Sequence, residues 1–358
     1  MAEPTQTQSQ NLLPYHHPPE TKERLQYANL TTIDLGEFDK PGGKERLAAQ
    51  LTVAVHNVGF FYVTNFGLNP DEINRQYAIG REFFALPEDV RRSYRAPLEE
   101  GIYNGYQPLG SIEVLPGLSC IKMSGSIPTS SGSTGPRLSA STATSTRTLP
   151  SSCCASSPLV LELPEQHISD GHLYESNCDS GLRYINYRAR SAEANERFQD
   201  LYSRGHTDNG TTTLLFQQPV AALQVRKGGR EESPWEWIRV PEGVVSVNVA
   251  DVLSMLSGGY LRSGVHRVVV PPEDQRARDQ LGLLYFVRPS DRLPLRRWDS
   301  PLLRRLGYCE EEGKGGGEGE VPALEWTRAR IRNNWSRSPT DADAGVSMAG
   351  FSVKQFYD

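Results

Sequence analysis

Seven short β-prone runs separated by Gly, Pro and Asp fill most of residues 181–290, and they constrain the fold more than any other feature of the chain. Each is rich in branched, aliphatic or aromatic residues, as strands are. The pattern does not alternate strands with long helices, which argues against a parallel βαβ sheet. We therefore expect an antiparallel sandwich or barrel. The runs read "LRYINY", "TTTLLF", "ALQVR", "WEWIRV", "VVSVNVADVLSML", "VHRVVV" and "LGLLYFV".

The opening third of the chain is predicted to be mixed β/α. Residues 30–36 read as a short strand, and Leu47, Leu51 and Val55 recur every four positions, as on one face of a helix. The β-prone run "GFFYVTNFGL" follows. Pro70 then suits the first turn of a second helix, "DEINRQYAIGREFFAL", because that turn does not need its missing N–H.

Composition and charge narrow the kind of ligand. The chain has 358 residues and 37% hydrophobic content, enough for a sizeable core in one large or two ordinary domains. A net charge of -5 and a pI near 5.9 disfavour a nucleic-acid binder and leave small molecules as the default ligand. We see no leader pattern and no run long enough to span a membrane, and five cysteines suggest reduced thiols. We therefore expect a cytoplasmic monomer without a membrane partner.

The motif "RGHTDNGTTTLLF" places His206 and Asp208 two residues apart, so in a strand both would face the same side. Alone this spacing is weak evidence, but His266 in "SGVHRVVV" lies on another expected strand. Two imidazoles and one carboxylate make the facial triad of non-haem Fe(II) sites, which leaves three coordination positions open. Zinc is the rival metal, although a hydrolytic zinc site usually has an acid or histidine base nearby, and the sequence suggests none.

Beyond this triad, several stretches match one family in the same order along the chain. They are "GFFYVTNFGL", "REFFALPEDVRRSY", "RGHTDNGTTTLLFQQPVAALQVR", "VSVNVADVLSMLSGGYLRSGVHRVV" and "LGLLYFVRP". Over residues 30–118 and 159–290, and in about the last ten residues, the chain resembles the isopenicillin N synthase-like family of Fe(II)/2-oxoglutarate-dependent dioxygenases. The resemblance implies an α+β fold with a mainly β core, a double-stranded β-helix (jelly roll) flanked by N-terminal helices.

The resemblance also implies roles for particular residues. His206, Asp208 and His266 would bind Fe(II), and Tyr187 in "LRYINYR" would reach the far carboxylate of 2-oxoglutarate. With O2 as the other co-substrate, such an oxidoreductase would hydroxylate or desaturate a small specialised metabolite and decarboxylate 2-oxoglutarate to succinate. The sequence does not identify the metabolite.

One departure from the family concerns the co-substrate. The family usually has an arginine on the closing strand, two residues before a Ser or Gly; here Gln280 stands in that position, followed by Gly282. An amide cannot supply the charge-assisted bidentate contact of a guanidinium. Arg278 lies two residues earlier and would share the same face if the strand extends that far. Without such a rescue, binding would be weak, or the protein would be an iron oxidase that uses no 2-oxoglutarate.

The second departure is a segment in which Ser and Thr dominate and apolar residues are few, so we expect it to be disordered. An ordinary linker is one interpretation. The other is out-of-frame translation: the codons CTG CTG CGC CTC TTC GCC encode Leu-Leu-Arg-Leu-Phe-Ala, and read one base later they give the "CCASSP" found here. In that case the chain could be an inactive product of a damaged gene model.

These observations divide the chain into five parts. They are a flexible tail (1–29), an N-terminal dioxygenase region (30–118), the Ser/Thr-rich segment (119–157), the jelly-roll core that binds Fe(II) and 2-oxoglutarate (159–290), and a C-terminal loop, helix and tail (291–358), with the helix at "EWTRARIRNNW".

Overall fold

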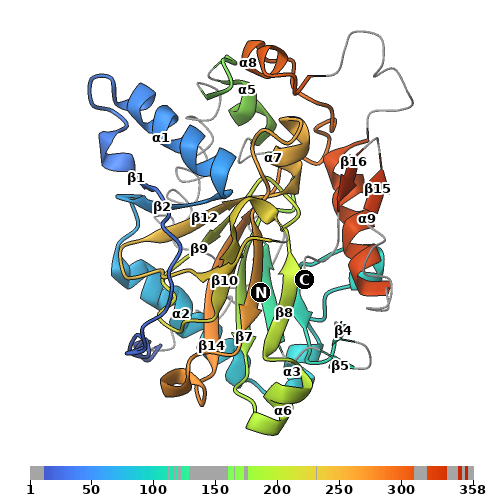
Figure 1. Cartoon of the computed structure of the whole chain (residues 1–358). Helices are drawn as coiled ribbons and strands as arrows, with labels where there is room; N and C mark the ends of the chain where they lie inside the picture. Colours follow the sequence, from blue (N-terminus) through green and yellow to red (C-terminus); the bar gives the residue numbers. More distant parts are fainter. Residues whose placement is uncertain are drawn as a thin grey trace, which may run out of the picture.

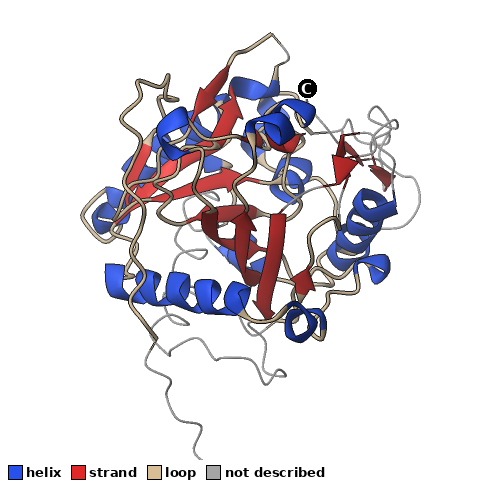
Figure 2. Cartoon of the chain, turned by 90° about the horizontal axis from the view of Figure 1, so that it is seen from below, coloured by secondary structure: helices blue, strands red, loops and turns tan. Residues whose placement is uncertain are grey.

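The computed structural model describes residues 12–111, 113–115, 118–119, 122–128, 160–164, 166–172, 176–230, 232–309, 321–336, 346–348 and 351–353. Its centre is a pair of sheets with helices around them (Figures 1 and 2). The larger sheet has eight strands in the order β1-β2-β12-β9-β14-β7-β6-β3, and the smaller has four in the order β11-β10-β13-β8. Apart from the parallel pair β1 and β2, neighbouring strands in these two sheets are antiparallel. This is the jelly-roll core expected from the sequence.

The larger sheet contains β1 (Thr32–Asp34), β2 (Phe60–Thr64), β3 (Tyr106–Gln107), β6 (Lys122–Pro128), β7 (Gly181–Tyr187), β9 (Thr212–Leu215), β12 (Val245–Val249) and β14 (Gln280–Val287). The smaller sheet contains β8 (Leu201–His206), β10 (Leu223–Arg226), β11 (Trp235–Trp237) and β13 (Val265–Val269). Two hairpins stand apart: β4 (Glu113–Leu115) with β5 (Leu118–Ser119), and β15 (Val346–Met348) with β16 (Phe351–Val353).

The helices are α1 (Gly43–Asn57), α2 (Pro70–Ala85), α3 (Glu88–Arg92), α5 (Gln166–Ser169), α6 (Ala192–Arg197), α7 (Asp251–Leu256), α8 (Pro301–Arg305) and α9 (Ala323–Ser336). Figure 1 places α5, α7 and α8 beyond one end of the sheets and α3 and α6 at the other. The two N-terminal helices and the C-terminal helix confirm the sequence expectations. None of the helices that the structure describes is long and apolar enough to cross a membrane.

Side chains of β7 and β14 point alternately to the two faces of the larger sheet, so one face packs in the core and the other lines a cavity. Leu182 and Tyr184 on β7, like Leu283 and Tyr285 on β14, point into the main hydrophobic core. Because strand side chains alternate between faces, the residues between them line the other face. On that face a cavity lies between the two sheets, lined from β7 and β14 by Arg183, Ile185, Tyr187, Gln280, Gly282, Leu284 and Phe286.

Helix α2 covers the core face of these two strands. Asn69 caps it by accepting from the Glu72 backbone N–H, while the Glu72 carboxylate accepts from the Asn69 N–H. This capping box fixes where the helix begins. The Tyr184 hydroxyl donates to Gln76 Oε1 at 2.7 Å, and its ring lies against Gly80, where a Cβ would come within 2.7 Å of a ring carbon.

We expect Gly80→Ala to destabilise the protein, although alanine is the better helix former by about 1 kcal/mol. The added methyl must displace the buried Tyr184 ring, and overpacking of this kind costs about 1–3 kcal/mol. Urea unfolding measures the difference. Glu82→Ala, on the exposed side of the same helix, is the control and should change stability by less than about 0.5 kcal/mol. A Gly80→Ala protein about 1 kcal/mol more stable than the parent would show that the ring moves aside freely.

Three sequence expectations were wrong in part. The run "VVSVNVADVLSML" was predicted to be β throughout, but after β12 the chain forms α7, a 6-residue helix that is buried on nearly every side and so shows no helical periodicity in its apolar residues. The tail was predicted to be flexible up to residue 29, yet Tyr15 stacks on Tyr77 and the Lys22 N–H donates to Asp274. Residues 1–11 lie outside the described part of the chain.

The third correction concerns the Ser/Thr-rich segment, expected to be disordered over 119–157. Its first part is ordered: Ser119 ends β5, and β6 pairs along its whole length with β7. Backbone hydrogen bonds to a neighbouring strand stabilise a polar segment that composition alone assigns to disorder. Residues 129–157, and with them the question of the reading frame, lie outside the described residues.

Candidate active site

The two predicted histidine ligands come from adjacent strands of the smaller sheet. His206 ends β8, His266 follows Val265 at the start of β13, and the two are direct cross-strand partners. Their ring centroids lie 4.3 Å apart. Antiparallel pairing therefore brings together two residues that are sixty positions apart in the sequence.

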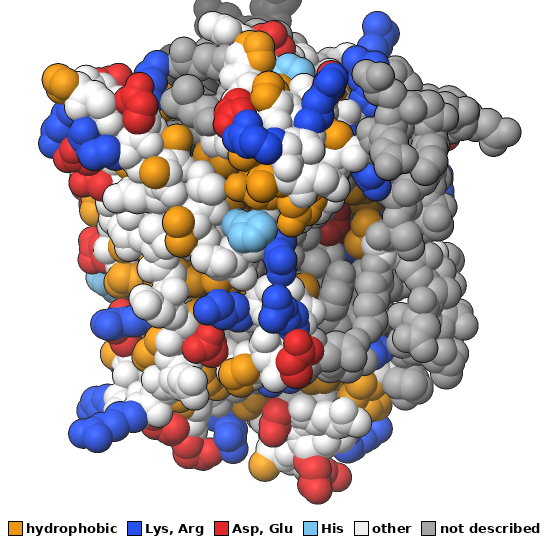
Figure 3. All heavy atoms as spheres, turned by 45° about the horizontal axis from the view of Figure 1, so that its top comes forward, with side chains coloured by type: hydrophobic (Ala, Val, Ile, Leu, Met, Phe, Trp, Pro, Cys, Tyr) orange, Lys and Arg blue, Asp and Glu red, His pale blue; other side chains and the backbone are white. Residues whose placement is uncertain are grey.

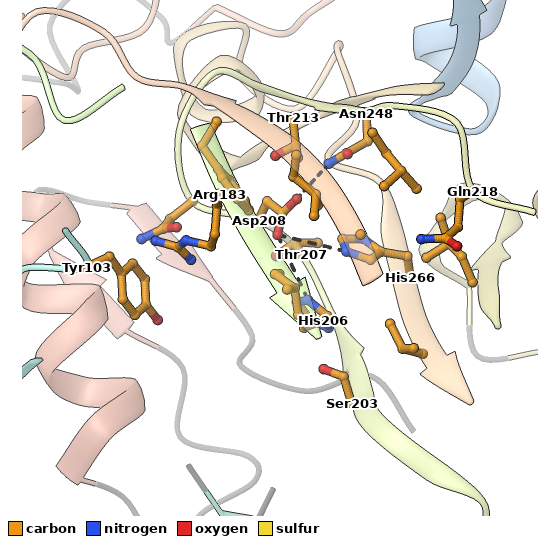
Figure 4. Close-up of a pocket in the computed structure, with 18 of the residues that line it drawn as sticks. Tyr103, Arg183, Ser203, His206, Thr207, Asp208, Thr213, Gln218, Asn248 and His266 are labelled. Carbon is orange, nitrogen blue, oxygen red and sulfur yellow. Dashed lines mark hydrogen bonds and ion pairs between the residues drawn. The ribbon is translucent and has the colours of Figure 1, made fainter. Parts of the chain in front are cut away.

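Asp208 lies beside the two histidines, but not because it shares a strand face with His206, as its spacing predicted. Strand β8 ends at His206, so Asp208 lies in the loop beyond it and not on the same strand face. The Asp251 N–H donates to the Asp208 carbonyl oxygen at 2.9 Å, which fixes this loop on the start of α7. The carboxylate of Asp208 turns back toward both imidazoles (Figure 4).

The three side chains have the geometry of a metal site. Asp208 Oδ1 lies 3.9 Å from His206 Nε2 and 3.8 Å from His266 Nε2, and all three ligand atoms lie within 4.8 Å of one another. A point equidistant from atoms so placed is at most about 2.5 Å from each, close to the ~2.0–2.2 Å bonds of first-row metals to imidazole and carboxylate. One ion can therefore contact all three.

The second nitrogen of each imidazole is already occupied. His206 Nδ1 lies 2.7 Å from the Arg204 carbonyl oxygen, and His266 Nδ1 lies 3.0 Å from the Gly264 carbonyl oxygen. A carbonyl can only accept, so Nδ1 carries the proton and Nε2 keeps its lone pair for a cation. Such partners orient metal-binding imidazoles and fix their tautomer.

Asp208 is held in its charged form. Burial alone would raise the pKa of its carboxyl, but His266, His206 and the Asn248 amide outweigh burial and lower the pKa to about 2. Asn248 Nδ2 donates to Asp208 Oδ2 at 3.1 Å, so the other oxygen, Oδ1, faces the imidazoles. The carboxylate is thus ionised and oriented before any metal binds.

We expect Asn248→Ala to weaken metal binding about 10–100-fold without unfolding the protein, since groups that orient a metal ligand have effects of this size. Anaerobic calorimetric titration with Fe(II) measures the affinity. The matched control is Ser246→Ala on the same strand, because the Ser246 hydroxyl has no hydrogen-bond partner among the described residues. Equal affinities of the two variants would contradict this role of Asn248.

The triad opens into a cavity of about 200 Å³ between the two sheets. At one end of it Tyr187 and Gln280 are cross-strand partners, and Gly282 follows on the same face. Gln280 is 5% exposed, and its Oε1 has no hydrogen-bond partner among the described residues. The residues assigned to 2-oxoglutarate by resemblance are therefore together, beside Gln218, whose amide lies close to Gly282.

Arg278, which the sequence offered as a replacement for the missing family arginine, is not among them. It is exposed, precedes β14 and does not line the cavity. The neighbouring Asp279 accepts from the Ala189 N–H at 2.9 Å and pairs with Arg188 at 3.0 Å. These contacts lie at the surface, and β14 begins at Gln280, after Arg278.

Several residues of the site were not predicted. Arg183 on β7 and Arg288, which directly follows β14, both line the cavity. Tyr103 lines it from the N-terminal region. The period-two alternation in "LRYINY" and "LGLLYFVR" contained the signal for the two arginines. The contact of Tyr103 had no signal in the sequence, because it depends on how the N-terminal region packs on the sheet.

A buried ion pair between Asp251 and Arg330 lies next to the loop that carries Asp208. Asp251 Oδ2 lies 2.9 Å from Arg330 Nη2 on α9, and Ser263 donates to Asp251 Oδ1 at 2.8 Å. Arg330 Nη2 also donates to the Thr207 carbonyl oxygen at 3.3 Å. The pair thus joins the start of α7, which holds the triad loop, to the C-terminal helix α9.

Comparison with known families agrees with this fold and site. Residues 30–119 match the family described as the N-terminal region of the non-haem dioxygenase in morphine synthesis, and residues 178–281 match the 2OG-Fe(II) oxygenase superfamily. Together with the jelly roll and the His-Asp-His cluster, these matches define an Fe(II)- and 2-oxoglutarate-dependent oxygenase. The chain belongs to the 2-oxoglutarate/Fe(II) oxygenases of the isopenicillin N synthase type.

Individual relatives are distant but cover most of the chain. The UPF0676 protein C1494.01 of Schizosaccharomyces pombe is 29% identical over 332 residues, covering 86% of this chain and 92% of its own. A 2-oxoglutarate-dependent dioxygenase of Didymella fabae is 26% identical over 288 residues, covering 72% and 84%. Among solved structures, Neurospora crassa T7H in complex with alpha-KG and thymine matches with a TM-score of 0.71 at 20% identity, covering 86% and 97%.

Proposed function

We propose that this oxygenase holds Fe(II) on His206, Asp208 and His266 and hydroxylates or desaturates a small specialised metabolite. One observation carries the proposal: the three ligand atoms converge at the wall of an internal cavity, with both imidazole Nε2 atoms directed at one carboxylate oxygen. The cavity side of this triangle is open, as an oxygenase requires for two co-substrates. The T7H structure with thymine supports a small molecule as the substrate class.

Bound Fe(II), together with 2-oxoglutarate and O2, would supply the oxidising chemistry, while the protein supplies position and exclusion of water. We propose that Tyr187, Gln280 and Gly282 accommodate the far end of 2-oxoglutarate, since they face the cavity together. Phe60 packs edge-on against the His266 ring at 5.5 Å and restrains its tilt. The apolar walls from both sheets keep bulk water from the reacting atoms.

The test is a coupled assay after anaerobic loading with Fe(II). We expect succinate to form from 2-oxoglutarate at a rate that rises when a substrate from a metabolite panel is added, with one succinate per oxidised product. If no metabolite raised the rate of succinate formation, a small-molecule substrate would be contradicted. Oxidised product without succinate would indicate an oxidase. A protein that does not bind Fe(II) would refute the proposal outright.

The oligomeric state and the location in the cell stay predictions from the sequence. We propose a monomer, which light scattering on the purified protein tests directly. On the face shown in Figure 3, basic and acidic side chains of the described residues are interspersed. A cytoplasmic location is tested by fractionation of cells that express the full chain.

A further inference from the structure

The guanidinium of Arg183, which lines the cavity, has no charge partner among the described residues. Arg183 makes no hydrogen bond or ion pair with the residues that the structure describes, and its Nε is buried. Its contacts are with two aromatic rings: its Cζ lies 4.5 Å from the ring centroid of Tyr103 and 4.7 Å from that of Phe286. These rings fix the position of the cation without using any of its N–H donors.

The described charged side chains around Arg183 have other partners. Arg330 is paired with Asp251, and Arg288 donates to the Asn209 carbonyl oxygen. Burial lowers the pKa of the Arg183 guanidinium while the negative charge of Asp208 raises it, and the proposed metal would neutralise that charge. Burial together with the positive charge of Arg183 lowers the pKa of Arg288 to about 10.

Arg183 lies at the opposite end of the cavity from the residues assigned to 2-oxoglutarate. Figure 4 shows it beside Tyr103, on the other side of the iron ligands from Gln218. Along β7 it is four residues from Tyr187, a separation of about 13 Å at the rise of a strand. This distance exceeds the length of a 2-oxoglutarate molecule, so one end of the cavity is left for a second ligand.

We propose that Arg183 binds the carboxylate of the primary substrate, which is therefore an organic acid with an apolar body. A guanidinium presents a planar fork of N–H donors that matches a carboxylate in a bidentate contact. Ile185, Leu284 and Phe286 line the adjoining wall and suit the apolar part. Anchored in this way, the substrate presents an atom several bonds from its carboxylate to the iron ligands. This inference rests on the proposed function and adds its substrate class.

The experiment uses protein loaded with Mn(II) and 2-oxoglutarate, so that binding is measured without turnover. Four acids are titrated calorimetrically beside their uncharged primary amides: benzoate, phenylacetate, cinnamate and hexanoate. We expect at least one acid to bind 10-fold or more tightly than its amide. Arg183→Gln should reduce that ratio to less than about 3-fold, and Arg183→Lys should retain part of it because a point charge remains.

The matched control is Arg188→Gln on the same stretch of chain, where the arginine is exposed and pairs with Asp279. It should keep the preference for the acid. Arg183→Gln must also bind Mn(II) and 2-oxoglutarate like the parent, which separates a substrate contact from general damage.

Each other outcome overturns a specific statement. If no acid is preferred over its amide by a protein that binds Mn(II) and 2-oxoglutarate, the substrate class is wrong while the proposed function stands. If Arg183→Gln keeps the preference, another group binds the carboxylate. If it loses 2-oxoglutarate, Arg183 belongs to the co-substrate. If the parent does not bind Mn(II), the proposed function itself fails.

Discussion

Asp208→Asn is expected to weaken Fe(II) binding by at least about 100-fold and to abolish succinate formation. Residues that only orient a ligand already change metal affinity about 10–100-fold, so removing the single negative charge of the triad should do more. The substitution keeps the size of the side chain, and Asn248 would still lie beside it. Anaerobic titration with Fe(II), followed by the succinate assay, measures both effects.

The control for this substitution is the same chemical change at Asp200. That residue is exposed, lies just before β8 and has a positive φ of 56°, which asparagine tolerates well. Asp200→Asn should bind Fe(II) like the parent. If Asp208→Asn did the same, the triad would not be the metal site, and both the proposed function and the substrate assignment would be withdrawn.

The second large effect is an increase in 2-oxoglutarate affinity. Gln280→Arg should strengthen 2-oxoglutarate binding by about 10-fold or more, because a charge-assisted hydrogen bond is worth about 1.5–3 kcal/mol and 1.4 kcal/mol is tenfold. The new guanidinium would lie beside Tyr187, at the end of the cavity where the described residues offer only neutral groups. Calorimetric titration of the Mn(II)-loaded protein measures the change.

Two comparisons make this result specific. Binding of 2-oxopentanoate, which lacks the far carboxylate, should not improve in Gln280→Arg. Arg278→Gln should leave 2-oxoglutarate affinity unchanged, because Arg278 is exposed and outside the cavity. If Arg278→Gln weakened binding instead, the exposed arginine would reach the co-substrate by a movement of its turn, as the sequence allowed.

The sequence was sufficient for the fold and the metal triad because both depend on patterns that are local in the chain. Strand runs and turn residues predicted the antiparallel core, and the HxD motif with a distant histidine predicted the ligands. The strand argument for Asp208 was nevertheless wrong, since β8 ends at His206 and the carboxylate arrives from a loop. The three predicted ligands do lie together, but Asp208 reaches the two imidazoles in a different way from the one that the spacing implied.

What the sequence did not provide was the pairing between distant segments. The sequence left open whether the strand extends to Arg278, because nothing local reveals that Asp279 accepts from the Ala189 N–H just before the strand begins. Strand β6 was missed because its order depends on β7. Arg183 has the correct strand parity in the sequence, but only the structure shows that Tyr103 and Phe286, and no carboxylate of the described residues, lie against its guanidinium.

The pairing of Arg330 with Asp251 makes the last described helix a support of the reaction centre. Truncation of the chain before residue 321 would remove what looks like a peripheral element and leave a carboxylate in the interior without its countercharge. Loss of one partner from a buried pair typically destabilises a protein by about 3–5 kcal/mol. Because the same guanidinium holds the Thr207 carbonyl oxygen, that trimming would also release the peptide between the first two iron ligands.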